Sequence, residues 1–121
     1  GKNYGWPVIT YGIDYSGVKI GEGTAKAGME PPVYYWDPVI APSGAIFYTG
    51  DAFKDWQGDL LIGSMTPGGL VRLELEGGKV VKETRYLGEL RERIRDVQQG
   101  ADGSIYLITD SAKGRVLRLQ P

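Results

Sequence analysis

The stretch that decides the fold is Gly58-Asp59-Leu60-Leu61-Ile62-Gly63-Ser64, followed after a short loop by Gly69-Leu70-Val71-Arg72-Leu73. Both parts recur later in the chain as Gly103-Ser104-Ile105-Tyr106-Leu107-Ile108-Thr109 and Gly114-Arg115-Val116-Leu117-Arg118-Leu119. The offset between the copies is 45 residues from Gly58 to Gly103 and 46 residues from Leu73 to Leu119. Repeats of roughly 40–50 residues built from short apolar runs are typical of β-propeller blades, each a four-stranded sheet.

Short runs rich in β-branched, aromatic and aliphatic residues lie on both sides of this repeat and predict strands. Residues 71–76 alternate apolar and charged side chains, as expected of a strand with one face in water. The pair Gly77-Gly78 predicts a two-residue hairpin. Residues 83–95 have a helix-like composition, but Gly88 and the β-like run at 93–97 favour strand, loop, strand. The predicted strands are 33–36, 45–48, 60–63, 70–76, 80–86, 94–98, 104–109 and 115–119.

The sequence divides into two parts of different composition. Residues 1–32 are rich in glycine, end at Pro31-Pro32 and lack periodic apolar positions, which predicts a long loop or insertion with one weak strand at most. Residues 33–121 hold about two four-stranded blades. Propellers typically have four to eight blades, so two blades cannot close a ring. We therefore predict an all-β fold that forms part of a larger propeller.

Composition excludes several classes of function. The 121 residues include no Cys and no His, and the formal net charge is −1. Without these residues there is no disulfide framework, no thiolate nucleophile, no Cys-based zinc site, no iron–sulfur cluster, no Ser-His-Asp hydrolase and no HExxH metalloprotease. The balanced charge provides no excess of basic residues that would favour binding to nucleic acid or an anionic membrane. No apolar run approaches the roughly 20 residues of a membrane span.

A family resemblance is carried by a series of short motifs in a fixed order. The motifs are Asn3-Tyr4-Gly5-Trp6-Pro7, Tyr35-Trp36, Ile40-Ala41-Pro42-Ser43-Gly44, Phe47-Tyr48-Thr49-Gly50-Asp51, Leu70-Val71-Arg72-Leu73, Arg93-Ile94-Arg95-Asp96-Val97, Asp102-Gly103 and Tyr106-Leu107-Ile108-Thr109-Asp110. Over essentially the whole chain they resemble the C-terminal part of the soluble pyrroloquinoline quinone (PQQ)-dependent glucose/sorbosone and aldose sugar dehydrogenases. Those enzymes are six-bladed propellers about three times this length. The resemblance implies that the N-terminal blades are absent from this chain.

The resemblance also implies a chemistry. The family oxidises the C1 hydroxyl of an aldose to a lactone and passes a hydride to PQQ, which a calcium ion polarises. In the family a His in an early blade is the general base, and most groups that hold the calcium beside PQQ also lie in early blades. This chain has no His, so we expect it to contain no catalytic residue and to be inactive alone. By resemblance the parent protein is periplasmic or secreted, although the chain shows no targeting signal.

Two arginines match the family's basic residues on the strand that faces the quinone. Arg93 and Arg95 are two residues apart, and such residues point to the same face of a strand. Two guanidiniums on one face can donate charge-assisted hydrogen bonds to a tricarboxylate such as PQQ. The alternative is that both arginines pair with Asp96 or Glu92 on a solvated face.

Two positions depart from the family pattern. Thr66 stands where the family usually has a Lys that contacts the quinone, and Val39 stands where it usually has Ser or Thr near the cofactor. Because an ammonium and a hydroxyl are lost, the resemblance implies weaker PQQ binding. The parent protein either works with altered contacts or has lost the cofactor in favour of another redox partner.

The Gly-rich segment contains a candidate calcium site. Some relatives bind structural calcium there, and Asp14 fits the spacing, with the carbonyl oxygens of Thr10 and Gly12 and the carboxylate of Glu22 as further ligands. The commoner role of such an Asp is to cap an Asx turn. The tryptophans suggest a sugar-stacking platform, with aromatic packing as the competing explanation; they are Trp6, Trp36 and Trp56.

Three functional hypotheses follow. The first is an incomplete sugar dehydrogenase that contributes cofactor-facing arginines when joined to its missing blades. The second is a non-catalytic propeller that binds a ligand or partner. The third is self-assembly, in which three copies of the chain complete a six-bladed ring and thereby cover the exposed sheet edges.

Overall fold

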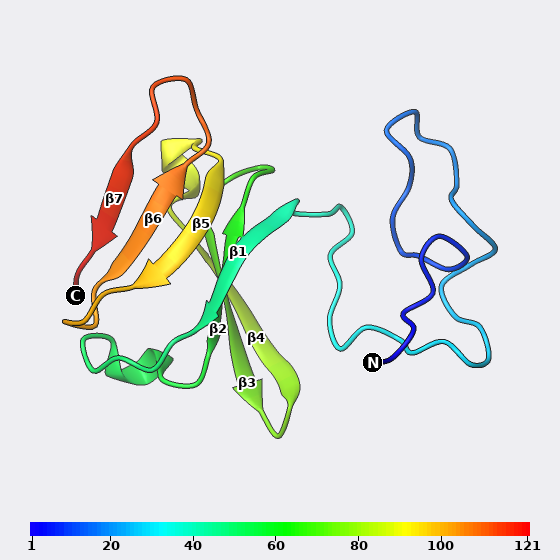
Figure 1. Cartoon of the computed structure of the whole chain (residues 1–121), viewed down its shortest axis with the longest axis horizontal. Helices are drawn as coiled ribbons and strands as arrows, with labels where there is room; N and C mark the ends of the chain where they lie inside the picture. Colours follow the sequence, from blue (N-terminus) through cyan, green and yellow to red (C-terminus); the bar gives the residue numbers. More distant parts are fainter. The chain divides into compact units, whose positions relative to one another are not determined.

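The computed structural model describes all residues from 1 to 121 and divides into two compact units, Gly1–Val39 and Ile40–Pro121 (Figure 1). We call them unit 1 and unit 2. Every strand of the structure belongs to unit 2. The helical elements are two 3₁₀ turns, Lys54–Trp56 and Gly88–Leu90, so no helix in the structure is long and apolar enough to cross a membrane.

Unit 2 consists of two antiparallel sheets, which confirms the all-β prediction. The first sheet has the strand order β1-β2-β3-β4, and its strands are β1 (Pro42–Phe47), β2 (Leu60–Ser64), β3 (Leu70–Glu76) and β4 (Lys79–Tyr86). The second sheet has the strand order β5-β6-β7, and its strands are β5 (Ile94–Gln99), β6 (Ile105–Thr109) and β7 (Val116–Leu119). Each sheet is a meander, as expected of a propeller blade, but the second has three strands where four were predicted.

The strand register reproduces the sequence repeat. In the first sheet Leu60 of β2 pairs with Leu73 of β3, and in the second sheet Ile105 of β6 pairs with Leu119 of β7. These are the pairs that the 45- and 46-residue offsets make equivalent. The two copies of the repeat therefore fold into the same hairpin, and the prediction of related blades is confirmed.

The predicted hairpin at Gly77-Gly78 is present. Glu76 pairs with Lys79 across a two-residue turn, and the two glycines have φ values of +56° and +77°. Such positive values belong to a primed turn, whose twist matches that of the flanking strands. After β4, the segment predicted as strand, loop, strand contains the short 3₁₀ turn before β5 begins at Ile94.

The core of unit 2 lies where the two sheets meet through their first strands, β1 and β5, which run side by side in Figure 1. Tyr48, at the end of β1, is fully buried, and its hydroxyl donates to the carbonyl oxygen of Gly103 at 2.7 Å. Ser43 hydroxyl donates to the carbonyl oxygen of Ile94 at 2.6 Å. These bonds hold one sheet against the other, around a buried cluster of Tyr48, Leu61, Leu70, Ile94, Val97, Ile105 and Leu107.

Unit 1 has no strand, and the prediction of a strand at residues 33–36 is wrong. Prolines flank that segment and remove backbone donors that a ladder needs. Its rings instead pack locally: Tyr35 stacks on Tyr11 with centroids 3.7 Å apart, and Tyr34 meets Trp36 edge-on at 5.2 Å. The only sheet-like pairings of unit 1 are isolated bridges between Ile9 and Gly23 and between Ile13 and Lys19.

Candidate functional site

The structure brings both predicted cofactor-binding arginines onto one carboxylate in unit 2. Arg93 donates to Oδ2 of Asp110 from Nε at 3.1 Å and from Nη2 at 2.9 Å. Arg95 donates to the same oxygen from Nη2 at 3.1 Å. We call this group of Arg93, Arg95 and Asp110 the arginine cluster. Arg93 directly precedes β5 and Arg95 lies within it, and both guanidiniums reach the same carboxylate oxygen.

A β-bulge at the start of β5 sets the position of Arg95. Ile94 pairs with Thr109, whereas Asp96 pairs with Ile108, so Arg95 is an extra residue on the β5 side. Bulges bend a strand and re-aim a side chain. The fully buried Ile94 anchors the bulge in the core.

The strand that carries Asp110 is fixed to the arginines through the backbone as well. The Asp110 amide donates to the carbonyl oxygen of Arg93 at 2.8 Å. The side-chain contacts therefore extend a hairpin that is already closed by main-chain bonds. We infer that the carboxylate is held in place before any ligand arrives.

The arginine cluster carries an excess of positive charge. Two guanidiniums at +2 and one carboxylate at −1 leave +1, and both arginine side chains are half exposed. The hydrogen bond from Arg93 is the main cause that lowers the pKa of Asp110; desolvation opposes it, and the charges of Arg95 and Arg93 lower the pKa further, so that the net shift is downward. Asp110 therefore stays ionised. Each guanidinium has five N–H donors, and only one from Arg95 is used on Asp110, so donors remain for an anion.

The alternative prediction named the wrong partners, Asp96 and Glu92, although both arginines do pair with a carboxylate and are half exposed, as that alternative expected. Asp96 accepts the backbone N–H of Val97 at 2.9 Å, and Glu92 forms an ion pair with Arg115 at 2.8 Å. The hairpin register explains the difference, because it places Asp110 across from the start of β5. Asp110 ends one of the motifs that carry the family resemblance, residues 106–110, but the sequence predicted no role for it. The spacing of the predicted strands at 94–98 and 104–109 was the signal that could have identified it.

The loop after β2 brings the region of Thr66 to the arginine cluster. The sulfur of Met65 lies 3.7 Å from Nη2 of Arg93, and the next residue, Thr66, is exposed. Gly68 holds this loop close to the neighbouring chain, because a Cβ there would lie 2.3 Å from the carbonyl oxygen of Glu92. Gly68 also has a φ of +106°, which favours glycine.

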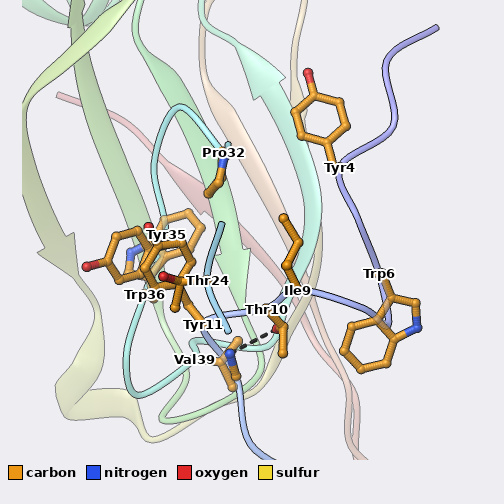
Figure 2. A pocket seen from close by; sticks show the side chains of 11 residues that line it. Tyr4, Trp6, Ile9, Thr10, Tyr11, Thr24, Pro32, Tyr35, Trp36 and Val39 are labelled. Atoms are coloured by element: carbon orange, nitrogen blue, oxygen red, sulfur yellow. Dashed lines mark hydrogen bonds between the residues drawn. The ribbon is translucent and has the colours of Figure 1, made fainter. Parts of the chain in front are cut away.

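Unit 1 contains a pocket of about 430 Å³ whose eleven lining residues include five aromatic ones (Figure 2). Val39, the other predicted cofactor contact, lines this pocket and belongs to unit 1, whereas Thr66 and the arginine cluster belong to unit 2. Stacked rings form one wall, and an exposed Trp6 stands at another side of the pocket in Figure 2. The lining includes Tyr4, Trp6, Tyr11, Tyr35, Trp36 and Val39.

The three tryptophans have different surroundings. Trp6 and Trp36 line the pocket of unit 1. Trp56 lies in unit 2, where it stacks on Phe53 with centroids 4.6 Å apart and lies beneath the guanidinium of Arg72 at 5.2 Å. The packing explanation therefore holds for Trp56, while the other two remain candidates for ligand contact.

The two carboxylates among the predicted calcium ligands of unit 1, those of Asp14 and Glu22, are engaged in other contacts. Asp14 accepts hydrogen bonds from the backbone and hydroxyl of Ser16 at 2.9 and 2.6 Å, and these bonds lower its pKa. That is the Asx turn given above as the alternative. Glu22 pairs with Lys26, and Thr10 Oγ1 accepts from the Gly12 amide. Calcium requires six to eight oxygens, and the structure contains no cluster of three acidic side chains suited to a metal. The calcium site stays a prediction without support from side-chain geometry.

Chemically, the arginine cluster suits anion binding rather than proton transfer. Its carboxylate is committed to two guanidiniums, and arginine does not deprotonate in proteins. An anion with several carboxylates can accept bonds from both guanidiniums at once, so a flat tricarboxylate fits the donors that the structure presents.

Comparisons with known proteins agree in sequence and in structure. The family model described as Glucose / Sorbosone dehydrogenase matches residues 1–118. The aldose sugar dehydrogenase YliI of Escherichia coli is 45% identical to the chain over 123 residues, which cover 100% of this chain and 33% of YliI. The chain thus spans about a third of the length of the curated relatives that it matches.

Two solved structures extend the comparison. A crystal structure of a glucose dehydrogenase superposes with a TM-score of 0.95 and 47% identity, over 100% of this chain and 36% of that one. The PQQ-bound aldose sugar dehydrogenase of Streptomyces coelicolor superposes with a TM-score of 0.70 and 21% identity, over 99% of this chain and 34% of that one. At that identity the second likeness concerns the fold alone.

Proposed function

The chain belongs to the glucose/sorbosone dehydrogenase family, and on that premise we propose that it is the segment of a sugar dehydrogenase that holds one side of the PQQ cofactor. The observation that carries the proposal is the arginine cluster, in which Arg93 and Arg95 share one oxygen of Asp110 and retain a net charge of +1.

In the full-length protein, bound PQQ supplies a two-electron acceptor for oxidation of the aldose C1 hydroxyl to the lactone. Arg93 and Arg95 bind and orient its carboxylates through charge-assisted hydrogen bonds. Asp110 keeps the two like-charged guanidiniums side by side and so reduces the freedom that each loses on binding. Met65 covers one edge of the Arg93 guanidinium.

The chain alone is proposed to be inactive. Proton removal from the sugar hydroxyl needs a general base, and the sequence contains no His. Asp110 is a poor substitute because its lowered pKa makes it a weak base. The base and the calcium ligands are proposed to come from the remaining two thirds of the protein, which the resemblance predicts to be periplasmic or secreted.

The aromatic pocket of unit 1 is proposed to contact the sugar. Its walls offer flat apolar surfaces from Trp36 and Tyr35, while Thr10 and Thr24 add hydroxyl groups. Such a mixture suits a sugar ring, which has an apolar face and polar edges. A change of Trp36 to Ala is expected to raise the KM for the aldose in the full-length enzyme more than it lowers kcat.

The departures at Thr66 and Val39 favour one alternative, a propeller that binds a ligand without catalysis. Both residues are exposed, and neither offers the charge or the polar contact that the family usually has at its position. In the dehydrogenase hypothesis these changes weaken PQQ binding without abolishing it, because the arginine cluster remains.

Titration of PQQ into the chain tests the proposal, with binding followed by quenching of tryptophan fluorescence. We expect saturable binding that weakens at least 10-fold in the Arg93→Ala, Arg95→Ala variant, since a hydrogen bond to a charged group contributes about 1.5–3 kcal/mol. Arg85→Ala is the matched control, because Arg85 is equally exposed and ion-paired with Glu83 on β4. Equal affinity of all three proteins would contradict the proposal. Turnover of glucose by the chain with PQQ, calcium and an artificial acceptor would contradict the claim that it is inactive alone.

A further inference from the structure

Met65 places a sulfur atom beside the arginine cluster, 3.7 Å from Nη2 of Arg93. The chain has two methionines and no cysteine, so oxidation of sulfur concerns only two positions. We propose that Met65 is an oxidation site, and that its sulfoxide occupies a donor of Arg93 and so weakens the binding of anions at the arginine cluster.

Backbone hydrogen bonds hold the loop of Met65 against the segment that carries Arg93. The Met65 amide donates to the carbonyl oxygen of Ala41 at 3.2 Å, and the Gly69 amide donates to that of Glu92 at 3.1 Å. Glu92 directly precedes Arg93, so the second bond ties the end of the loop to the chain next to the guanidinium. Both side chains therefore start from fixed backbone positions, which keeps the sulfur near the guanidinium.

The donors of Arg93 indicate what the sulfur controls. A guanidinium has five N–H donors, of which Nε carries one and each terminal nitrogen carries two. Nε and one N–H of Nη2 are bonded to Asp110, which leaves the other N–H of Nη2 for the sulfur of Met65. A thioether is a weak acceptor, so an incoming anion can displace it from this donor.

A peroxide converts the thioether to a sulfoxide in one balanced step. The sulfur lone pair attacks one oxygen of hydrogen peroxide, the O–O bond breaks, and the leaving oxygen takes up the proton of the transferred oxygen and departs as water. Sulfur loses two electrons and the peroxide gains them. Negative charge grows on the leaving oxygen, and the Arg93 guanidinium is close enough to stabilise it. We therefore expect Arg93 to accelerate oxidation of Met65.

The sulfoxide is a polar group, and its oxygen is a stronger acceptor than the sulfur that it replaces in the contact. From a sulfur 3.7 Å away, this oxygen can reach the usual N–H···O range of about 2.7–3.2 Å from Nη2. It then competes with an anion for the same N–H. Oxidation leaves the net charge of the cluster unchanged, so the expected loss is that of one directed donor.

The second methionine offers a comparison within the chain. Met29 belongs to unit 1, which contains no arginine, and a Cβ on Gly5 would lie 2.9 Å from its sulfur. Met29 and Met65 are both partly buried, so exposure alone does not separate them. A difference between their rates of oxidation therefore reports their different surroundings.

Treatment of the chain with hydrogen peroxide, followed by mass spectrometry of its peptides, tests the site. We expect Met65 to gain one oxygen at least 3-fold faster than Met29. Arg93→Leu uncovers the sulfur but removes the guanidinium, so slower oxidation of Met65 in this variant supports the assigned cause. Oxidation of Met65 no faster than that of Met29, or faster oxidation in Arg93→Leu, would overturn the proposal.

Titration of PQQ tests the effect on binding, and this part rests on the proposed function. Met29→Leu leaves Met65 as the sole methionine, and Met65→Leu is the matched control. After peroxide treatment, Met29→Leu should bind PQQ at least 5-fold more weakly and should recover with methionine sulfoxide reductases, whereas Met65→Leu should be unchanged. Met65→Gln carries a permanent amide oxygen and should bind weakly without peroxide.

Citrate, a small tricarboxylate, is the second probe and is followed through the NMR signals of the Arg93 guanidinium. A reduced chain that binds citrate but not PQQ contradicts the proposed function alone, and loss of citrate binding on oxidation then supports the inference. A reduced chain that binds neither overturns both. The inference also fails if oxidised Met29→Leu binds as well as its reduced form, or if its affinity falls only together with its urea midpoint, because the loop has then come apart.

Discussion

The buried pair of Arg72 and Asp59 gives the sharpest stability prediction, through the change Arg72→Met. In the structure Arg72 Nε lies 2.6 Å from the Asp59 carboxylate, and Nη2 donates to the Asp55 carbonyl oxygen at 2.6 Å. Methionine keeps the apolar stem of the side chain over Trp56 but removes every donor. The Asp59 carboxylate is then left about nine-tenths buried without its cation.

Removing one partner of a buried ion pair costs about 3–5 kcal/mol, which is a large part of the roughly 5–15 kcal/mol that stabilises a typical domain. For a small protein with an m value of about 1 kcal/mol per molar urea, the unfolding midpoint falls by about 3–5 M. Urea titration followed by far-UV circular dichroism measures this shift.

Arg85→Met is the control for the same experiment, because Arg85 makes a half-exposed pair with Glu83 on β4. Exposed pairs contribute about 0–1 kcal/mol, so this variant should unfold near the natural protein. If Arg72→Met lowers the free energy of unfolding no more than Arg85→Met does, the assignment of a stabilising buried pair is refuted.

Three further predictions concern the arginine cluster and the loop beside it. Gly68→Ala should lower the free energy of unfolding by more than the roughly 1 kcal/mol that a positive φ alone costs, because its Cβ would meet the Glu92 carbonyl oxygen. Gly58→Ala is the control in the same urea titration, since Gly58 has a φ of +87° but open space around its Cβ position. Because its pKa is lowered in the folded state, Asp110 contributes stability above the unfolded-state pKa near 4, and this contribution is lost as pH falls through the folded-state pKa. In Arg93→Ala the titration midpoint of the Asp110 carboxyl, followed by ¹³C NMR, should rise. An unchanged midpoint would contradict the assigned cause. Thr66→Lys should tighten PQQ binding several-fold at low salt, because an added ammonium next to Met65 brings a further positive charge toward the cofactor. The gain in affinity should fade at high salt, and a salt-independent change in the fluorescence titration would count against the electrostatic explanation.

The repeat explains why the fold of unit 2 could be predicted from sequence. The copies at 58–73 and 103–119 each bring an apolar strand, a turn and a second strand, and local patterns of this kind determine a hairpin. The Val33–Trp36 run shows the opposite case. Its β-prone aromatic residues satisfied the strand pattern, but flanking prolines and the stacking of Tyr35 on Tyr11 gave them a different arrangement. Ring stacking between residues 24 apart leaves no periodic signal.

Only part of the candidate site could be predicted from the sequence. The spacing of Arg93 and Arg95 indicated that the two side chains act together, but the structure brings them to one carboxylate at a bulge and not by regular strand alternation. Their partner depended on the register of β5 against β6, including the bulge at Arg95, and a bulge shifts register by one residue without a clear sequence mark. The contact of Met65 with Arg93 depends on a loop that Gly68 and Gly69 hold against Glu92, which no local pattern predicts.

The most direct test of the central claim is an NMR titration that follows the side-chain Nε–H signals of the arginines while PQQ is added to the chain. The account predicts that the signals of Arg93 and Arg95 shift together and saturate at one affinity, while those of Arg85 and Arg118 stay in place. Saturable shifts at Arg85 or Arg118 with Arg93 and Arg95 unmoved would contradict it.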